Sequence, residues 1–281
     1  MPLDAAIELR FDRYLLPKSA VRQSILLSTG NVPFDCHQAP CLQPVYDVVE
    51  RVVSFRLAEG ALLAPGLLYH VELTSPLDGD DTRGFRAFDG APLSTTNAVP
   101  LKWSFFTARA TPTPPLPPAA PTCNDALGAL SRSGCSSAGC HSGGDAPMGL
   151  RLDSGEALRE TAIAHVAHEA DTGPISGQPL VDPARFGTGM PVIDPGAPGT
   201  SYLMYKLLVG PANFGACETK YEVGLPSGIC PAPSPAERTR LLDWFVRLEP
   251  MPLGGTLVGT RETLDLLQGF ILAGSQAGTC P

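Results

Sequence analysis

Apolar and polar side chains alternate along much of the first 107 residues. The alternation recurs, with turn residues between, in six segments: residues 7–11, 24–29, 45–49, 52–57, 68–73 and 101–107. A period of two predicts strands that bury one face, and short strands separated by turns are typical of an all-β sandwich. We therefore expect residues 1–110 to form an N-terminal all-β sandwich domain.

Beyond residue 121 the apolar positions follow a helical period. This period predicts helices over residues 125–133, 156–170 and 201–209, and two more that begin at Ser234 and Thr260. Ser234 is suited to cap its helix, with Pro235 in the first turn and Glu237 completing a capping box. The last helix is expected to bury one face, formed by Leu264, Leu267, Phe270 and Ile271.

Residues 111–121 separate these two halves. Their sequence, Thr-Pro-Thr-Pro-Pro-Leu-Pro-Pro-Ala-Ala-Pro, holds six prolines in eleven residues, a composition that favours polyproline II. The chain is thus predicted to be multidomain, with the sandwich over residues 1–110, a Pro-rich linker over 111–121 and a mainly α domain over 122–281.

Composition narrows the classes of function. The 281 residues are 43% hydrophobic and 17% charged, which supplies enough apolar side chains for two cores. The formal net charge is −8 and no Lys/Arg cluster is present, which argues against nucleic acid as a partner. No apolar run reaches the length of a membrane span. The first eleven residues are typical of a strand rather than a signal peptide, so we expect an export signal upstream.

The segment Cys135-Ser-Ser-Ala-Gly-Cys140-His141 carries the clearest chemistry in the sequence. Two thiols followed directly by an imidazole form the arrangement that attaches a c-type haem: each cysteine adds to a porphyrin vinyl group, and the histidine binds the iron. Two residues usually separate the cysteines, whereas four separate them here. These four are small, so a wider loop can still bring both sulfurs to one porphyrin edge. We expect covalent haem c with His141 as the proximal ligand.

A second iron ligand is expected on the other face of the haem. Met251 is the first candidate, because it lies in a Pro/Gly loop ahead of the last predicted helix and the following proline restricts its backbone. Met–His ligation raises the reduction potential. The runners-up are Met190, which also precedes a proline, and the pair His165 and His168, which share a face of a predicted helix. Alternatively, Met251 only fills a gap at the surface, and His165 and His168 only lie on a solvent-exposed face of their helix.

Locality along the chain predicts three pairs among the other six cysteines. These pairs are Cys36–Cys41, Cys217–Cys230 and Cys123–Cys280, the last joining the ends of the second half. An even number of such cysteines fits an oxidising compartment. Haem attachment to thiols also takes place outside the bacterial cytosol, so the expected location is periplasmic, outer-surface or secreted.

Two other interpretations of the cysteine–histidine segment are open. In a haem-free, disulfide-stabilised surface or adhesion protein, Cys135 and Cys140 would bond to each other and His141 would be an ordinary loop residue. In a zinc site, the same three side chains would be joined by His165 or His168.

Other chemistry has weaker signals. Asp78, Asp80 and Asp81 form a candidate calcium loop, although acidic loops are usually solvated. The sequence contains no nucleophile elbow, phosphate loop or HExxH motif. This absence favours an electron carrier over an enzyme.

Residues 63–73 combine a Pro65-Gly66 turn with Tyr69, whose hydroxyl can hydrogen-bond back across the corner. With the segments at residues 2–11 and 103–107, this stretch resembles the bacterial Ig-like domains of S-layer and other surface proteins. The resemblance covers about residues 1–108. It implies an Ig-like spacer or interaction domain.

The second half resembles the cytochrome c-like domains of large secreted proteins from bacteria such as planctomycetes and myxobacteria. The matching segments are residues 135–144, 149–154, 193–203 and 251–255. The resemblance implies a cytochrome c-like fold, covalent haem, export, and electron transfer with a redox partner protein. The sequence departs from the pattern in its widened cysteine spacing, and in residues 224–228, which stand where a methionine loop would be expected.

Overall fold

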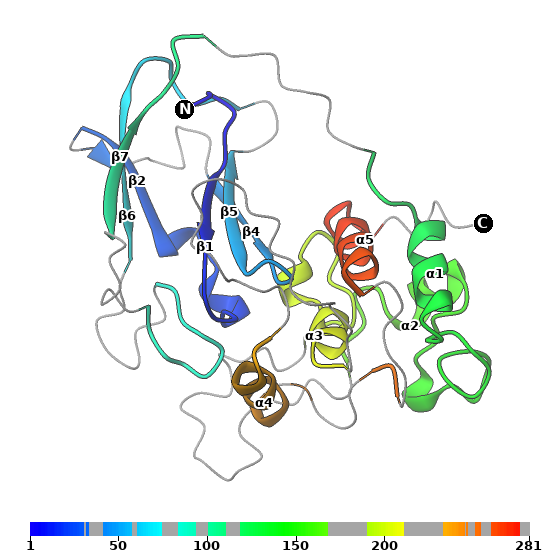
Figure 1. The fold of residues 1–281 in the computed structure, drawn as a ribbon. Coiled ribbons are helices and arrows are strands. Elements are labelled where there is room, and N and C mark those ends of the chain that lie inside the picture. Colours follow the sequence, from blue (N-terminus) through cyan, green and yellow to red (C-terminus); the bar gives the residue numbers. More distant parts are fainter. Residues whose placement is uncertain are drawn as a thin grey trace. The chain divides into compact units, whose positions relative to one another are not determined.

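The computed structural model describes residues 1–30, 32–33, 42–57, 61–74, 84–93, 101–110, 119–167, 190–210, 233–244, 246, 251–253 and 260–275. The chain divides into two compact units, which we describe separately (Figure 1). The first comprises Met1–Tyr46 and Val52–Pro118. The second comprises Asp47–Arg51 and Ala119–Pro281.

The first unit holds two small sheets. One has the order β1-β5-β4, formed by Ile7–Arg10, Val52–Leu57 and Leu42–Asp47. The other has the order β3-β2-β6-β7, formed by Val32–Pro33, Ile25–Thr29, Leu68–Leu73 and Lys102–Phe106. In the four-stranded sheet each neighbouring pair is antiparallel. Each of the six predicted segments contains a strand, although β4 begins three residues before the predicted segment and ends two residues short of its end.

Alternate side chains are buried in β2 and β6, whereas no side chain of β7 is buried. Val53, Phe55 and Val71 are almost completely buried, and the ring of Phe85 lies 6.2 Å from that of Phe55. The Tyr69 hydroxyl accepts a hydrogen bond from the Ala64 backbone N–H at 2.9 Å. This bond across the corner confirms the role predicted for the tyrosine.

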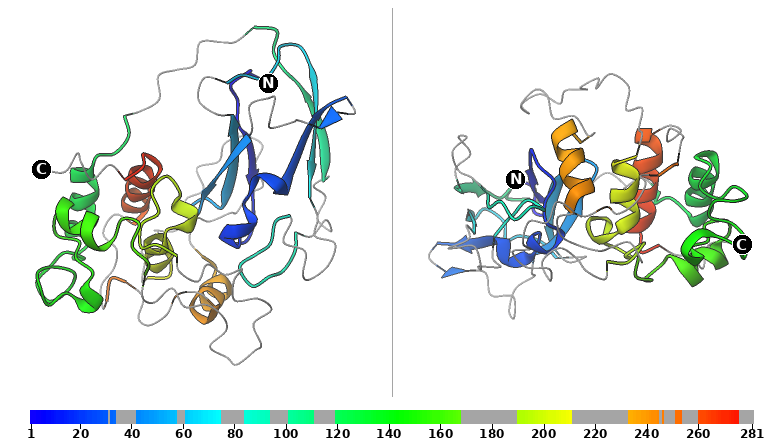
Figure 2. Two further views of the ribbon diagram at one scale, coloured as in Figure 1. Left: turned by 180° about the vertical axis from the view of Figure 1, so that it is seen from behind. Right: turned by 90° about the horizontal axis from the view of Figure 1, so that it is seen from below.

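The second unit holds all five described α-helices. They are α1 (Cys123–Arg132), α2 (Gly155–Thr161), α3 (Tyr202–Leu208), α4 (Pro235–Trp244) and α5 (Thr260–Leu272). Helix α5 packs against both α1 and α3 (Figures 1 and 2). Its predicted apolar face is confirmed as core, because all four of its side chains are at most 1% exposed.

Side chains cap the helices where the sequence indicates. Thr122 and Asp125 form a reciprocal capping box at α1. At α4 the predicted cap is confirmed, since the Ser234 hydroxyl accepts a hydrogen bond from the Glu237 backbone N–H at 3.2 Å. These bonds satisfy N–H groups that have no partner within the helix.

The predicted fold class, an Ig-like all-β sandwich followed by a separate mainly α cytochrome c-like domain, is wrong. Within the described residues the protein is mixed α/β, with sheets of three and four strands and five α-helices, two of them only seven residues long. One segment that precedes the linker, the turn at Asp47–Arg51, belongs to the helical unit. Alternating apolar and polar residues identify individual strands, but they do not show in which compact unit a turn packs.

The turn at Asp47–Arg51 is part of the core of the second unit. Val48 and Val49 are fully buried, and Glu50 forms an ion pair with Arg261 of α5. Burial raises the pKa of Asp47, which is opposed by hydrogen bonds from the Glu50 backbone and the Gln268 side chain. Among the described residues, no helix is long and apolar enough to cross a membrane.

Two helical glycines test the packing of this unit. A Cβ on Gly128 of α1 would meet only the end of the Arg132 side chain, at 3.3 Å. A Cβ on Gly269 of α5 would lie 2.9 Å from Cγ of the rigid Pro121 ring. Gly128→Ala should therefore raise the free energy of unfolding by about 1 kcal/mol, whereas Gly269→Ala should lower it by about 1 kcal/mol. Urea unfolding measures both, and equal stabilisation by the two variants would contradict this packing.

Candidate functional site

The cysteine–histidine loop begins directly after α1. Gly134 adopts a positive φ of 76°, which glycine tolerates, and turns the chain out of the helix. The Cys135 N–H then donates to the carbonyl of Leu130 at 2.9 Å. Helix α1 thus fixes the position of the first cysteine.

The loop closes on itself despite the wide spacing of its cysteines. The His141 N–H donates to the Cys135 carbonyl at 3.0 Å, and the Cys140 N–H donates to the Ser137 carbonyl at 3.0 Å. Gly139 has a positive φ of 81° immediately before the second cysteine. The four intervening residues therefore form a compact turn that brings His141 back to the backbone of Cys135.

The ring of His141 is oriented by a backbone carbonyl. Its Nδ1 lies 3.1 Å from the oxygen of Leu150. Because a carbonyl oxygen only accepts, Nδ1 carries the proton and the lone pair of the neutral ring is at Nε2. The Leu152 N–H donates to the His141 carbonyl at 2.8 Å, so the same segment, residues 150–152, holds both the backbone and the ring of His141.

The two thiols have different surroundings. Cys135 is buried and Cys140 is exposed, and both are free thiols. Burial, with a smaller contribution from the nearby Cys140, raises the pKa of Cys135 to about 11. Cys135 is therefore protonated at neutral pH, whereas the exposed position of Cys140 leaves its sulfur accessible.

The backbone of Met251 lies against the end of α3. Gly210 follows the end of α3, and a Cβ built there would lie 2.0 Å from the Met251 carbonyl oxygen. The segment at residues 251–253 therefore approaches the helix end at a distance that only glycine permits. The Met251 side chain is half-buried.

Met190 and His165 lie on paired segments, because the Val192 N–H donates to the His165 carbonyl at 2.7 Å. Met190 is buried, and its carbonyl accepts a hydrogen bond from the Ala167 N–H at 2.9 Å. His165 is exposed. The prediction that it lies on a helix is wrong, since α2 ends at Thr161 and Ala164 adopts a positive φ of 59°. His168 lies outside the described residues.

Bridges between Ile163 and Ile193 and between Val166 and Pro191 replace the predicted end of the helix. The backbone at residues 163–166 thus pairs with a segment some 25 to 30 positions further along the chain. This long-range pairing overrides the helical preference of an alanine-rich stretch.

The remaining sequence predictions concern metals and disulfides. Within the part of the chain that the structure describes, no three His, Cys, Asp or Glu side chains converge in a way that could hold a metal ion. This finding gives the zinc interpretation no support, and Asp78, Asp80 and Asp81 lie outside the described residues. Cys123 is disulfide-bonded. The other cysteines of the three predicted pairs also lie outside those residues, so the pairings stay predictions.

Sequence reasoning missed two groups that shape this site. The Leu150 carbonyl has no sequence signal, because any residue supplies a carbonyl. Gly210 does have one, because a glycine after an apolar helical run marks a helix end. The sequence matches no protein-family model and no curated protein, so the function must be argued from these residues.

The accessibility of the thiols can be measured by alkylation. Iodoacetamide at pH 9 should modify Cys140 much faster than Cys135, because about one Cys135 thiol in a hundred is ionised there. Cys135 should become reactive as the pH approaches 11. Mass spectrometry of the peptides reports both sites, and urea-unfolded protein, in which the rates should be similar, is the control. Equal rates in the folded protein would contradict the burial of Cys135.

The approach of Met251 to α3 can be tested at Gly210. Gly210→Ala should lower the free energy of unfolding by about 1–3 kcal/mol, because the new methyl group overlaps a backbone carbonyl that cannot rotate away. Gly144→Ala is the control, since a Cβ there meets no atom within 4 Å. Denaturant unfolding distinguishes the two, and equal effects would show that residues 251–253 lie elsewhere.

Proposed function

We propose that this chain is an exported mono-haem c-type electron carrier, with haem attached to Cys135 and Cys140 and its iron bound by His141. The observation that carries the proposal is the hydrogen bond between His141 Nδ1 and the Leu150 carbonyl. Histidines that bind metals through Nε2 usually donate their other ring N–H to a carbonyl or carboxylate, which fixes the ring and makes it a better donor.

The thiols also fit covalent attachment. Addition of an S–H bond across a vinyl group consumes a thiol and releases no leaving group, so both cysteines must be free beforehand. Both are free. Because Cys135 is buried in the closed loop, we expect attachment to take place before the loop closes on α1.

Haem, when bound, supplies an iron that cycles between the ferrous and ferric states. The chain holds the imidazole of His141 in one orientation through Leu150. Met251 is the proposed second ligand, and its thioether would raise the reduction potential. The proposed partner is a redox protein. A disulfide at Cys123 supports an oxidising location outside the cytosol.

Expression together with haem-maturation machinery tests the proposal. The purified protein should gain the mass of one haem and give a haem-stained band on a denaturing gel. Cys135→Ser/Cys140→Ser should lose the covalent haem, while Ser136→Ala/Ser137→Ala keeps it. His141→Ala should keep the thioethers but change the absorbance of the ferric form, because an axial ligand is lost. Colourless protein with a Cys135–Cys140 disulfide would instead support a haem-free surface protein.

Met251 can be tested by the reduction potential of the same preparation. Met251→Leu should lower the potential, because loss of a thioether ligand removes a preference for ferrous iron. Met204→Leu is the matched control, since Met204 is fully buried in α3. If Met190→Leu lowers the potential and Met251→Leu does not, the second ligand is Met190.

A further inference from the structure

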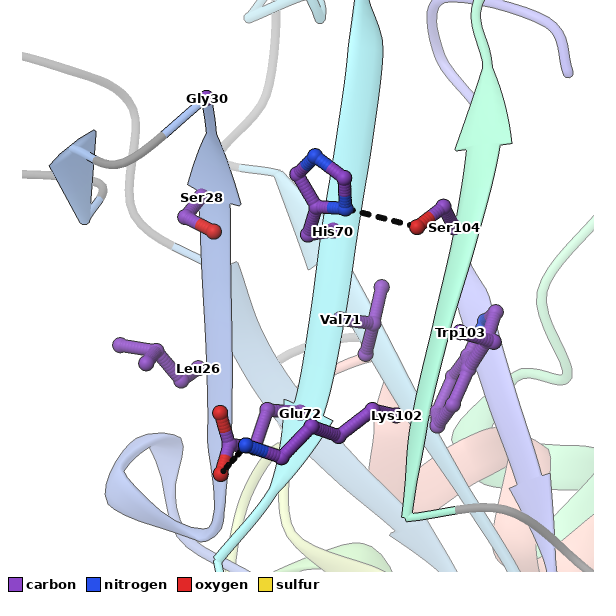
Figure 3. Close-up of a pocket in the computed structure, with 9 residues that line it drawn as sticks. All are labelled: Leu26, Ser28, Gly30, His70, Val71, Glu72, Lys102, Trp103 and Ser104. Carbon is purple, nitrogen blue, oxygen red and sulfur yellow. Dashed lines mark hydrogen bonds and ion pairs between the residues drawn. The ribbon is translucent and has the colours of Figure 1, made fainter.

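The outward face of the four-stranded sheet carries a cavity, lined by both polar and apolar residues, that the proposed electron transfer does not use. Two cross-strand rows form its floor. The first is Ser28, His70 and Ser104, and the second is Leu26, Glu72 and Lys102. The cavity has a volume of about 340 Å³ (Figure 3). All of its lining residues come from the first unit.

Contacts between strands hold the polar groups in place. His70 Nδ1 lies 2.7 Å from the Ser104 hydroxyl, and Lys102 Nζ lies 2.8 Å from a Glu72 carboxylate oxygen. Both contacts join β6 to β7, as the dashed lines in Figure 3 show. These contacts restrain the donors and acceptors before any ligand arrives, which lowers the cost of binding.

The charge of the face selects the kind of ligand. Among the described residues that line the cavity, Lys102 and Glu72 carry the charges, and they neutralise each other. A charged ligand would be attracted by one member of this pair and repelled by the other, so the pair adds little to its affinity. A hydroxyl group can both donate and accept a hydrogen bond. It therefore suits a surface that offers donors and acceptors side by side, here an ammonium, a carboxylate, an imidazole and two serine hydroxyls.

Apolar surface adjoins these polar groups. Leu26 is 42% exposed at one side of the cavity. Side chains two apart on a strand share a face, so Phe106, which is 65% exposed, continues the face of Lys102 and Ser104 along β7. Exposed apolar side chains beside fixed polar groups are typical of ligand sites. They match the C–H faces of sugar rings.

We propose that this sheet face binds a neutral oligosaccharide. The hydroxyl groups of the sugar pair with His70, Ser104 and the Glu72–Lys102 pair, and its ring faces lie against Leu26 and Phe106. Because every one of these residues belongs to the first unit, this binding is independent of haem attachment. The two proposals therefore fail or succeed separately.

Calorimetric titration of the full chain with maltohexaose, cellohexaose and mannohexaose tests the site. At least one should bind with a Kd of about 1 mM or tighter. His70→Ala and Ser104→Ala should each weaken binding about tenfold, because a hydroxyl group of the sugar loses its hydrogen-bond partner. Gln43→Ala, an exposed change on β4 of the other sheet, should leave the Kd unchanged. Thermal unfolding confirms that each variant is folded.

Three results would overturn the proposal. One is the absence of binding by all three hexamers up to about 10 mM. Another is binding of hexagalacturonate or of a charged peptide in preference to every neutral hexamer. The third is an unchanged Kd in folded His70→Ala and Ser104→Ala, which would place the sugar elsewhere on the chain.

Discussion

The hydrogen bond from His141 Nδ1 to the Leu150 carbonyl is the constraint on which the functional account depends. It determines which ring nitrogen keeps its lone pair, and therefore which side of the imidazole can bind a metal. The bond requires residues 150–152 to lie beside the cysteine–histidine loop. The hydrogen bond from the Leu152 N–H to the His141 carbonyl holds them there. A histidine at the same place in a mobile loop would lack this orientation.

The same site shows how a wide cysteine spacing is accommodated. The bond between the His141 N–H and the Cys135 carbonyl brings the histidine back to the first cysteine, so the four residues between the cysteines add a turn rather than length. One thiol is buried by this closure and the other is not.

Local features of the fold could be predicted from the sequence, while its assembly could not. The N-cap at Ser234 and the apolar face of α5 could be predicted, because capping and periodicity depend only on residues that are close in the sequence. The turn at Asp47–Arg51 completes the helical unit through contacts with α5, more than 200 residues away. At the site, the cysteines and histidine are visible as a motif, whereas the carbonyl of Leu150 is not, since its role depends on where the backbone passes. Helix α2 was predicted too long for the same reason, because Ile163 pairs with Ile193.

The tautomer of His141 in the haem-free chain is the most direct test of this account. Long-range ¹H–¹⁵N correlation spectra of ¹⁵N-histidine-labelled protein in mildly alkaline buffer report which ring nitrogen carries the proton, and His141→Gln identifies the signal. The account predicts a proton on Nδ1 and a lone pair on Nε2. A proton on Nε2, or rapid exchange between the two tautomers as in free imidazole, would contradict it.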